Sequence, residues 1–352
     1  MSAARDAAFR VLTRVERGGY ASDLLRRETL ATRDAALAEA IVFGCLRFQA
    51  QLDHVIAGLT PRQKLDSEVR IALRMGVYQI RYMDRIPAHA AVSESVELVK
   101  AARKKSAAPL VNAVLRKITR DPVTWPDAAV ECSVPAWMLD RWERQFGRDV
   151  ALGIARAALA EPETPVNPAT GRRQDIGARS VVPLLDLEPG MTLLDLCAAP
   201  GNKTAQALAA GARVIAGDRY RTRLAEVPGE AVRVVLDARE PLPFSRKFER
   251  ILIDAPCSGT GTLARNPEIK WRLRVEDLAR FQELQKAILD RALGQLAPGG
   301  RLVYATCSLE REENEDVVAG YAVSQVHRRL PGQEPGDGCF AAVVGQAVSP
   351  AR

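Results

Sequence analysis

The sequence contains few of the residues on which metal sites and hydrolytic triads are built. Its 352 residues include only three His, at positions 54, 89 and 327. The six Cys, at positions 45, 132, 197, 257, 307 and 339, form no CxxC pair and no Cys/His spacing. We therefore expect no metal site, no disulfide framework and reduced thiols.

Long apolar runs are also missing. No uninterrupted apolar stretch reaches the length of a membrane span, and residues 1–6 lack the apolar core of a secretory signal. We expect a cytoplasmic protein that does not contact a membrane.

The positive charge is concentrated at the start of the chain. The formal net charge is +7, yet residues 1–120 hold 21 Lys/Arg against 12 Asp/Glu, a surplus of nine. The remaining 232 residues hold 29 against 31. The basic residues cluster at Arg5, Arg10, Arg14 and Arg17, at 103–105, and at Arg116, Lys117 and Arg120. This asymmetry favours a nucleic-acid-binding module, although an ordinary solvated helical surface also fits.

Two sequence regimes follow one another. Residues 5–118 show apolar residues at helical spacing and no strand pattern, which predicts a helical bundle. A Pro-bounded connector follows, with predicted helices over 136–146 and 150–160. From residue 191 the pattern becomes strand, turn, helix, with strands expected at 191–196, 213–218, 232–237, 249–254 and 301–307. Such alternation predicts an α/β fold with a doubly wound, mostly parallel sheet.

Acidic residues accompany the ends of the first three strands: Asp195, Asp218 and Asp237. An acid about twenty residues beyond a glycine-containing first loop commonly binds the ribose of an adenosine ligand. The loop 198–201 has neither GxGxxG spacing nor a Walker A pattern, which disfavours NAD and nucleoside triphosphates. The pattern therefore favours S-adenosylmethionine as cofactor.

Two further strands end in a Cys beside small residues. The stretch 251–261 begins in the fourth strand and carries Asp254 and Cys257. The stretch 302–309 begins in the fifth strand and carries Cys307. Ligands bind at the carboxyl ends of parallel strands, so both thiols are placed where chemistry occurs. A buried Cys can also be a small core residue, and the residues alone do not order the two thiols.

These segments resemble a known family. Residues 195–204, 254–261 and 305–309 are similar to three motifs of the Sun/RsmB family of RNA (cytosine-5)-methyltransferases, and residues 265–271 and 312–316 also fit it. Residues 20–25, 42–48, 73–80, 89–98 and 111–118 resemble the NusB-type helical RNA-binding fold. The resemblance implies three parts: a NusB-like domain (1–120), a shortened helical connector (121–175) and a Rossmann-like methyltransferase domain (176–352).

The resemblance also implies roles. Cys307 would be the nucleophile that adds to carbon 6 of cytosine, Cys257 would help to release the product, and Asp254 would hold the base. The cofactor contacts would be Cys197, Ala198, Ala199, Pro200, Gly201, Asn202, Lys203, Asp218, Asp237 and Asp254. The partner would be RNA, most plausibly small-subunit ribosomal RNA, bound by a monomer. For Lys203 we leave open whether it lowers the pKa of a thiol or only shapes the loop.

Two departures from the family pattern stand out. Asn202 replaces a glycine, which we explain by a loop position of positive φ that Asn tolerates. The small RNA-contacting subdomain that relatives carry near residues 167–174 is nearly absent. Two alternatives to the enzyme remain: an RNA-binding assembly or antitermination factor with a vestigial methyltransferase domain, and an NAD-linked oxidoreductase.

Overall fold

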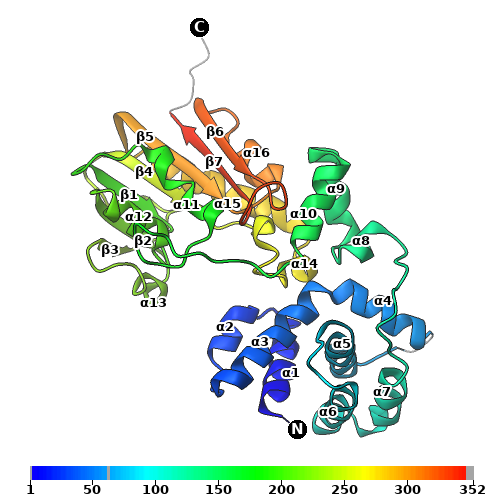
Figure 1. Cartoon of the computed structure of the whole chain (residues 1–352). Coiled ribbons are helices and arrows are strands. Elements are labelled where there is room, and N and C mark those ends of the chain that lie inside the picture. The colour runs from blue at the N-terminus through cyan, green and yellow to red at the C-terminus, as the bar shows by residue number, and fades with distance from the viewer. Residues whose placement is uncertain (1, 62–63, 346–352) are drawn as a thin grey trace. The chain divides into compact units, whose positions relative to one another are not determined.

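The structure is a computed structural model that describes residues 2–61 and 64–345. By its internal contacts the chain divides into two units. The helical unit comprises Met1–Ala160 and Leu263–Arg272, and the sheet unit comprises Glu161–Thr262 and Leu273–Arg352 (Figure 1). The first unit thus includes ten residues that lie far along the sequence, between two strands of the second.

The helical unit is built from short and medium helices around the central helix α5. Its elements are α1 (Ala3–Val15), α2 (Ala21–Arg26), α3 (Thr32–Arg47), α4 (Gln49–Leu59), α5 (Ser67–Tyr82), α6 (Ala88–Ala101), η1 (Lys105–Ala107), α7 (Ala108–Leu115), α8 (Ala128–Glu131), α9 (Ala136–Phe146), α10 (Arg148–Ala157) and α14 (Ile269–Arg272). Every residue of α5 from Ile71 to Ile80 is buried. A helix segment that is buried on all sides lies in the core, so the neighbouring helices pack around α5.

Close approach of the helices around α5 depends on two glycines. A Cβ on Gly44 of α3 would lie 1.9 Å from the Tyr78 ring, and one on Gly76 of α5 would lie 2.5 Å from Leu115 of α7. Both distances are far below van der Waals contact. Any larger residue would therefore push these helices apart.

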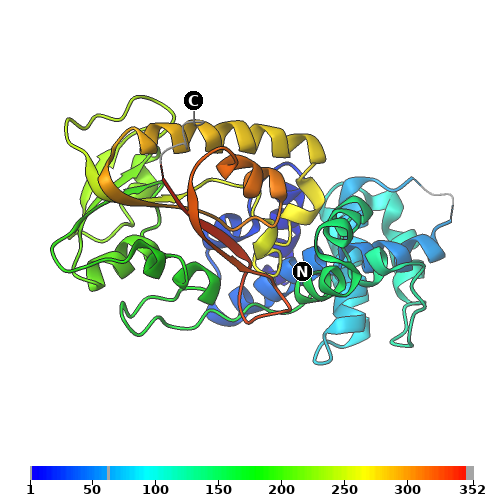
Figure 2. The same cartoon turned by 90° about the horizontal axis from the view of Figure 1, so that it is seen from above.

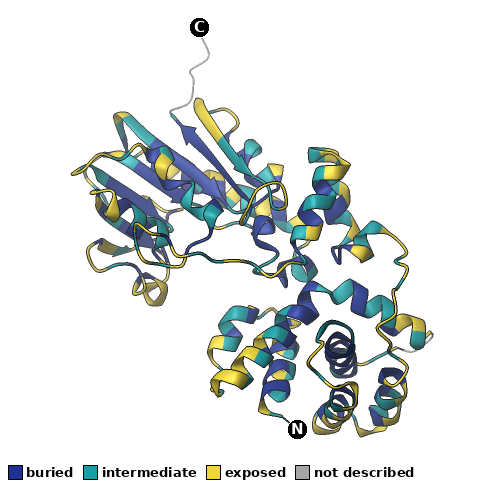
Figure 3. Cartoon of the chain, viewed as in Figure 1, coloured by how far each residue is buried: buried dark blue, intermediate teal, exposed yellow. Residues whose placement is uncertain are grey.

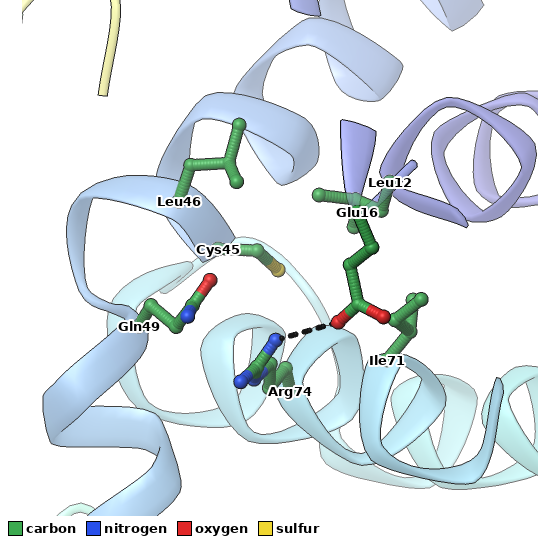
Figure 4. Close-up of a pocket in the computed structure, with 7 residues that line it drawn as sticks. All are labelled: Leu12, Glu16, Cys45, Leu46, Gln49, Ile71 and Arg74. Carbon is green, nitrogen blue, oxygen red and sulfur yellow. Dashed lines mark hydrogen bonds and ion pairs between the residues drawn. The ribbon is translucent and has the colours of Figure 1, made fainter. Parts of the chain in front are cut away.

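The buried Arg74 of α5 also forms ion pairs with partly exposed carboxylates of α4 and of the residue that follows α1. Arg74 donates to both carboxylate oxygens of Asp53 at 2.7 Å and to Glu16 at 3.1 Å. Figure 4 shows Arg74 and Glu16 lining a small pocket beside the Cys45 thiol. Burial raises the pKa of Cys45 well above its usual range, so this thiol is a packing residue.

The ten-residue segment 263–272 caps two helices of this unit, one at its start and one at its end. The Glu268 carboxylate accepts from the Ala21 amide at the start of α2, at 3.0 Å. At the end of α3, Lys270 Nζ donates to the Arg47 carbonyl (2.8 Å) and Trp271 Nε1 to the Leu46 carbonyl (2.7 Å). These groups satisfy backbone atoms that helix ends leave without partners. The segment is therefore integral to the helical unit.

The sheet unit contains a seven-stranded sheet within the described residues, in the order β3-β2-β1-β4-β5-β7-β6. Its strands are β1 (Thr192–Leu196), β2 (Arg213–Asp218), β3 (Val232–Val235), β4 (Phe248–Asp254), β5 (Leu296–Thr306), β6 (Val323–Arg329) and β7 (Cys339–Val344). Strands β1 to β5 pair in parallel, whereas β7 pairs antiparallel with both β5 and β6. The predicted doubly wound, mostly parallel sheet is confirmed.

Helices cover both faces of the sheet (Figure 2). The remaining elements are α11 (Ile176–Arg179), η2 (Val182–Leu185), α12 (Asn202–Ala209), α13 (Arg221–Leu224), η3 (Thr260–Thr262), α15 (Val275–Leu293), η4 (Arg311–Glu313) and α16 (Glu315–Val318). One core packs α15 and α16 against alternate residues of β1, β4 and β5. The other packs η2, α12 and α13 against the opposite face. The central strands are accordingly buried, whereas β6 has one exposed edge (Figure 3).

Several predicted boundaries are wrong by a few residues. Strand β3 ends at Val235 rather than at residue 237, and β5 begins at Leu296 rather than at residue 301. Helix α10 runs over 148–157, not 150–160. In each case a cap or a strand pairing decides the boundary, and neither appears in hydrophobic periodicity.

Candidate active site

The loop between β1 and α12 is held in a sharp turn. Cys197 has φ +66° and Gly201 has φ +95°, and the Ala199–Pro200 peptide bond is cis. A Cβ on Gly201 would lie 2.8 Å from the backbone of Val227, so only glycine fits there. Gly201 precedes α12, and Asn202 is the first helical residue. Our explanation of Asn202 by a positive φ is therefore wrong, because the left-handed position is Gly201.

Asp218 holds this loop from the end of β2. Its carboxylate accepts from the Ala199 amide at 3.2 Å and from the Tyr220 amide at 2.9 Å, and the residue is buried. Asp237 instead pairs with Arg239, whose side chain holds the pKa of that carboxyl at about 2. Both acids lie beyond neighbouring strand ends, as the sequence predicted.

Asp195 is fully buried at the end of β1. One oxygen accepts from Thr204 Oγ1 at 2.5 Å, and the other has no hydrogen-bond partner among the described residues. Burial raises the pKa of Asp195 to about 7. A buried polar atom without a partner is uncommon in folded proteins, and here it faces the pocket described next.

The loop opens onto a pocket with a volume of about 110 Å³. Its lining residues are Ala178, Asp195, Ala198, Ala199, Pro200, Asn202, Lys203 and Asp254. Six of these were predicted cofactor or base contacts. Cys197, Gly201, Asp218 and Asp237, which were also predicted, are not among the lining residues. Ala178 of α11 and, as a lining residue, Asp195 were not predicted.

Lys203 and Asp254 face each other in this pocket. Lys203 Nζ lies 2.6 Å from Asp254 Oδ2, and the lysine side chain is largely buried. Burial by itself lowers the pKa of Lys203, but the charge and hydrogen bond of Asp254 outweigh it, so the pKa is raised. The lysine is thus a stable cation with a carboxylate partner, a pairing that neither sequence interpretation of Lys203 anticipated.

The two candidate thiols are adjacent. Cys257 follows β4 and Cys307 follows β5, and their Sγ atoms lie 3.4 Å apart. The hydrogen bond with Cys307, together with burial, raises the pKa of Cys257 well above its usual range. Burial also raises the pKa of Cys132 and Cys339, neither of which lies beside a second thiol among the described residues. The strand-end pair is therefore distinct from the other cysteines.

One buried acid near the thiols was not singled out from the sequence. Glu313, within the predicted 312–316 motif, accepts hydrogen bonds from Ser258 and Ser308, the residues that follow the two cysteines. No local sequence signal marks it, because its partners lie 55 and 5 residues away.

The basic clusters of the helical unit differ in availability. Arg5 is buried against Gln79, and Arg10 pairs with Asp6 and Glu28. Four basic residues around η1 and α7 are exposed: Arg103, Lys105, Arg116 and Lys117. Arg14 and Arg17 of the first cluster are exposed as well, so both clusters contribute accessible basic residues.

Comparison with known proteins gives a consistent assignment. The profile of the family described as "16S rRNA methyltransferase RsmB/F" matches residues 182–334, and that of the NusB family matches residues 2–120. Ribosomal RNA small subunit methyltransferase B of Thermus thermophilus is 35% identical, over 98% of this chain and 94% of its own length. The chain belongs to the ribosomal RNA small subunit methyltransferase B family.

Other members of the methyltransferase B family give the same result. The Klebsiella pneumoniae protein of that name is 32% identical, over 93% of this chain and 94% of its own. Among solved structures, PH0851 is similar over 97% of this chain and 98% of its own, with a TM-score of 0.79 and 20% identity. A methyltransferase homolog from Pyrococcus horikoshii covers 64% of this chain, with a TM-score of 0.54. At 20% and 22% identity, these two structures support the fold alone.

This member of the methyltransferase B family has a short turn near residues 167–174, where relatives carry an additional subdomain. Val166 and Arg173 form an antiparallel bridge, and Arg172 points from the turn to the cofactor loop. Arg172 Nε donates to Asn202 Oδ1 at 2.8 Å, and Nη2 donates to the Pro200 carbonyl at 3.3 Å. The unusual Asn202 therefore has a partner in the turn.

Proposed function

We propose that this protein transfers a methyl group from S-adenosylmethionine to carbon 5 of a cytosine in small-subunit ribosomal RNA. The observation that carries this proposal is the pair of thiols 3.4 Å apart at adjacent strand ends. Carbon 5 of cytosine is a poor nucleophile until a thiolate adds to carbon 6, so this reaction needs a positioned Cys. The names of the relatives supply the RNA class.

The pocket beside the β1–α12 loop fits the cofactor. Its lining combines small apolar residues with acids at strand ends. The free oxygen of Asp195 can accept a hydrogen bond from such a ligand. Residues 197–203, Asp218, Asp237 and Asp254 would hold S-adenosylmethionine, with Asp218 acting in part through the loop that it orders. The bound cofactor supplies an electrophilic methyl group.

The environment of the thiols favours Cys307 as the nucleophile. The raised pKa of Cys257 keeps a proton on that sulfur, from which it can donate to Cys307. Cys307 adds to carbon 6, and Lys203 and Asp254 face the pairing edge of the base. After methyl transfer the carbon 5 proton passes to solvent, and the electron pair of that C–H bond re-forms the double bond between carbons 5 and 6. Cys307 then leaves carbon 6 as a thiolate, and the Cys257 thiol assists by donating to it.

RNA recognition falls to the NusB-like domain in this proposal. Its accessible basic residues around η1 and α7 can contact phosphates, and the target base must be unpaired or flipped out to reach the thiols. We retain the division into a NusB-like domain (1–120), a connector (121–175) and a methyltransferase domain (176–352). A ribosomal RNA substrate also implies action in the cytoplasm.

Methyl transfer from labelled S-adenosylmethionine to ribosomal RNA, followed by bisulfite mapping, tests the proposal. We expect one or a few cytosines to be labelled. RNA binding without methyl transfer would instead favour the assembly-factor alternative. Titration with S-adenosylmethionine and with NAD tests the alternative of an NAD-linked oxidoreductase. We expect S-adenosylmethionine to bind and NAD not to bind.

A further inference from the structure

A carboxylate without a cationic partner lies behind the two thiols. Glu313 is fully buried, and no Lys or Arg nitrogen of the described residues lies within 4 Å of its oxygens. Burying a charge is costly unless hydrogen bonds compensate it. Its surroundings therefore have to supply donors.

The donors come from both cysteine loops. Glu313 Oε2 accepts from the Ser258 amide at 2.8 Å, and Oε1 accepts from Ser308 Oγ at 2.6 Å and from Ser258 Oγ. Ser258 directly follows Cys257 and Ser308 directly follows Cys307. A single side chain thus joins the residues next to both thiols.

Helix α15 and the neighbouring Asn complete this arrangement. Gln285 Nε2 donates to Glu313 Oε2 and to the Pro256 carbonyl, both at 3.0 Å. Asn314 accepts from Thr306 Oγ1 at 2.6 Å and donates to the Ser308 carbonyl at 2.9 Å. The backbone is therefore held on both sides of Cys257 and directly after Cys307, whereas the two sulfur atoms are hydrogen-bonded to each other.

The partners of Glu313 suit a carboxylate. All four groups that contact its oxygens donate to them: two hydroxyls, which can also accept, one backbone amide and one side-chain amide. A carboxylate only accepts, whereas a glutamine would turn an NH₂ group toward them. The charge also adds to the raised pKa of Cys257, after the larger effects of the Cys307 hydrogen bond and burial.

We propose that Glu313 is a positioning residue that sets the spacing of Cys257 and Cys307 and keeps Cys257 in its thiol form. This inference rests on the proposed methyl transfer, in which one sulfur attacks while the other holds a proton. Without Glu313, the two loops lose their common anchor, and Cys257 ionises more readily and competes with Cys307.

The test compares Glu313→Gln with the control Glu283→Gln, which makes the same chemical change at an exposed position of α15. We expect Glu313→Gln to lower kcat on the order of 100-fold, since displacing a reacting group by about 1 Å can have that effect. The KM values for S-adenosylmethionine and RNA should stay near those of the control.

A second readout does not depend on methyl transfer. Alkylation of each thiol by iodoacetamide, followed by mass spectrometry across a pH series, reports the ionisation of Cys257 directly. Glu313→Gln should move the midpoint for Cys257 to lower pH, and Glu283→Gln should not. If Glu313→Gln fails to fold, Ser308→Ala removes one anchor and should give a smaller loss of kcat at unchanged KM.

An unchanged alkylation midpoint together with control-level kcat would overturn the inference. A loss of kcat that tracks thermal destabilisation, with the midpoint unmoved, would also overturn it in favour of a purely structural role. If the unaltered protein transfers no methyl group, the proposed function fails, while the alkylation series still decides whether Glu313 tunes Cys257.

Discussion

Cys257 Sγ lies 3.4 Å from Cys307 Sγ, within hydrogen-bonding distance for two thiols. This relationship predicts different outcomes for the two alanine variants. Cys307→Ala should abolish methylation and form no adduct, because no sulfur attacks carbon 6. Cys257→Ala should permit attack and methyl transfer but block release, so that a covalent protein–RNA complex accumulates.

Denaturing gels of each variant with RNA and S-adenosylmethionine distinguish these outcomes. The slow-migrating band should appear with Cys257→Ala and be absent from the double variant. A band with Cys307→Ala instead would reverse the two roles. Full activity in both variants would mean that these thiols are packing residues only.

Arg172→Ala should weaken cofactor binding. The substitution removes hydrogen bonds to the Asn202 side chain and the Pro200 carbonyl, both in or next to the cofactor loop. One such bond contributes about 1 kcal/mol, so we expect the Kd for S-adenosylmethionine to rise about fivefold. Calorimetric titration measures this. Arg173→Ala, an exposed neighbour in the same turn, should leave the Kd unchanged, and equal effects would argue against the contact.

Neutralising the exposed basic residues around η1 and α7 should lower the affinity for RNA and make that affinity less dependent on salt. In the full chain, Arg103, Lys105, Arg116 and Lys117 are replaced by Ala. Each lost phosphate contact should reduce the slope of log K against log salt by about 0.7–0.9, measured between about 50 and 200 mM salt. The matched control replaces the exposed Arg26, Arg27, Arg33 and Arg144. If both variants lose the same slope, the surface has no special role.

Lys270 predicts a pH dependence of stability in the helical unit. Burial lowers its pKa to about 7, whereas in the unfolded chain it should be near 10.4. At pH values between these two pKa values, the unfolded state binds more protons than the folded state, so the free energy of unfolding increases as pH rises. This gain in stability is lost as pH falls through about 7. From about pH 7 to 9, the protein should gain on the order of 2 kcal/mol relative to Lys270→Met.

Tryptophan fluorescence during denaturant titration measures this difference. All four Trp, at positions 125, 137, 142 and 271, belong to the helical unit, so the signal reports that unit. Lys117→Met, at an exposed position, should follow the unaltered protein at both pH values. A constant difference between the protein and Lys270→Met would show that the ammonium is not destabilised by burial.

In the part of the chain that the structure describes, no single helix is long and apolar enough to cross a bilayer. Helices α3 and α4 meet that length and composition only as a pair, which is bent by 77°.

The sequence by itself determined the elements and the edge of the sheet at which the chemistry lies. Alternating strands and helices predicted a parallel sheet, and the residues that end β1, β2, β4 and β5 were recognisable because strand ends meet at one edge. The motifs at 195–204, 254–261 and 305–309 predicted the family. These features depend on neighbours in the chain or on periodicity, both of which are visible in a sequence.

Only the tertiary structure decided which of these residues meet. Lys203 pairs with Asp254 across 51 residues, Glu313 reaches Ser258 across 55, and Glu268 caps the start of a helix 247 residues before it. Periodicity does not encode such contacts, because they depend on how finished elements pack. The same holds for Asn202, whose partner is set by a turn thirty residues before it. Cys257 and Cys307 lie close together because β4 pairs with β5, and this proximity arises only when the two strands have paired.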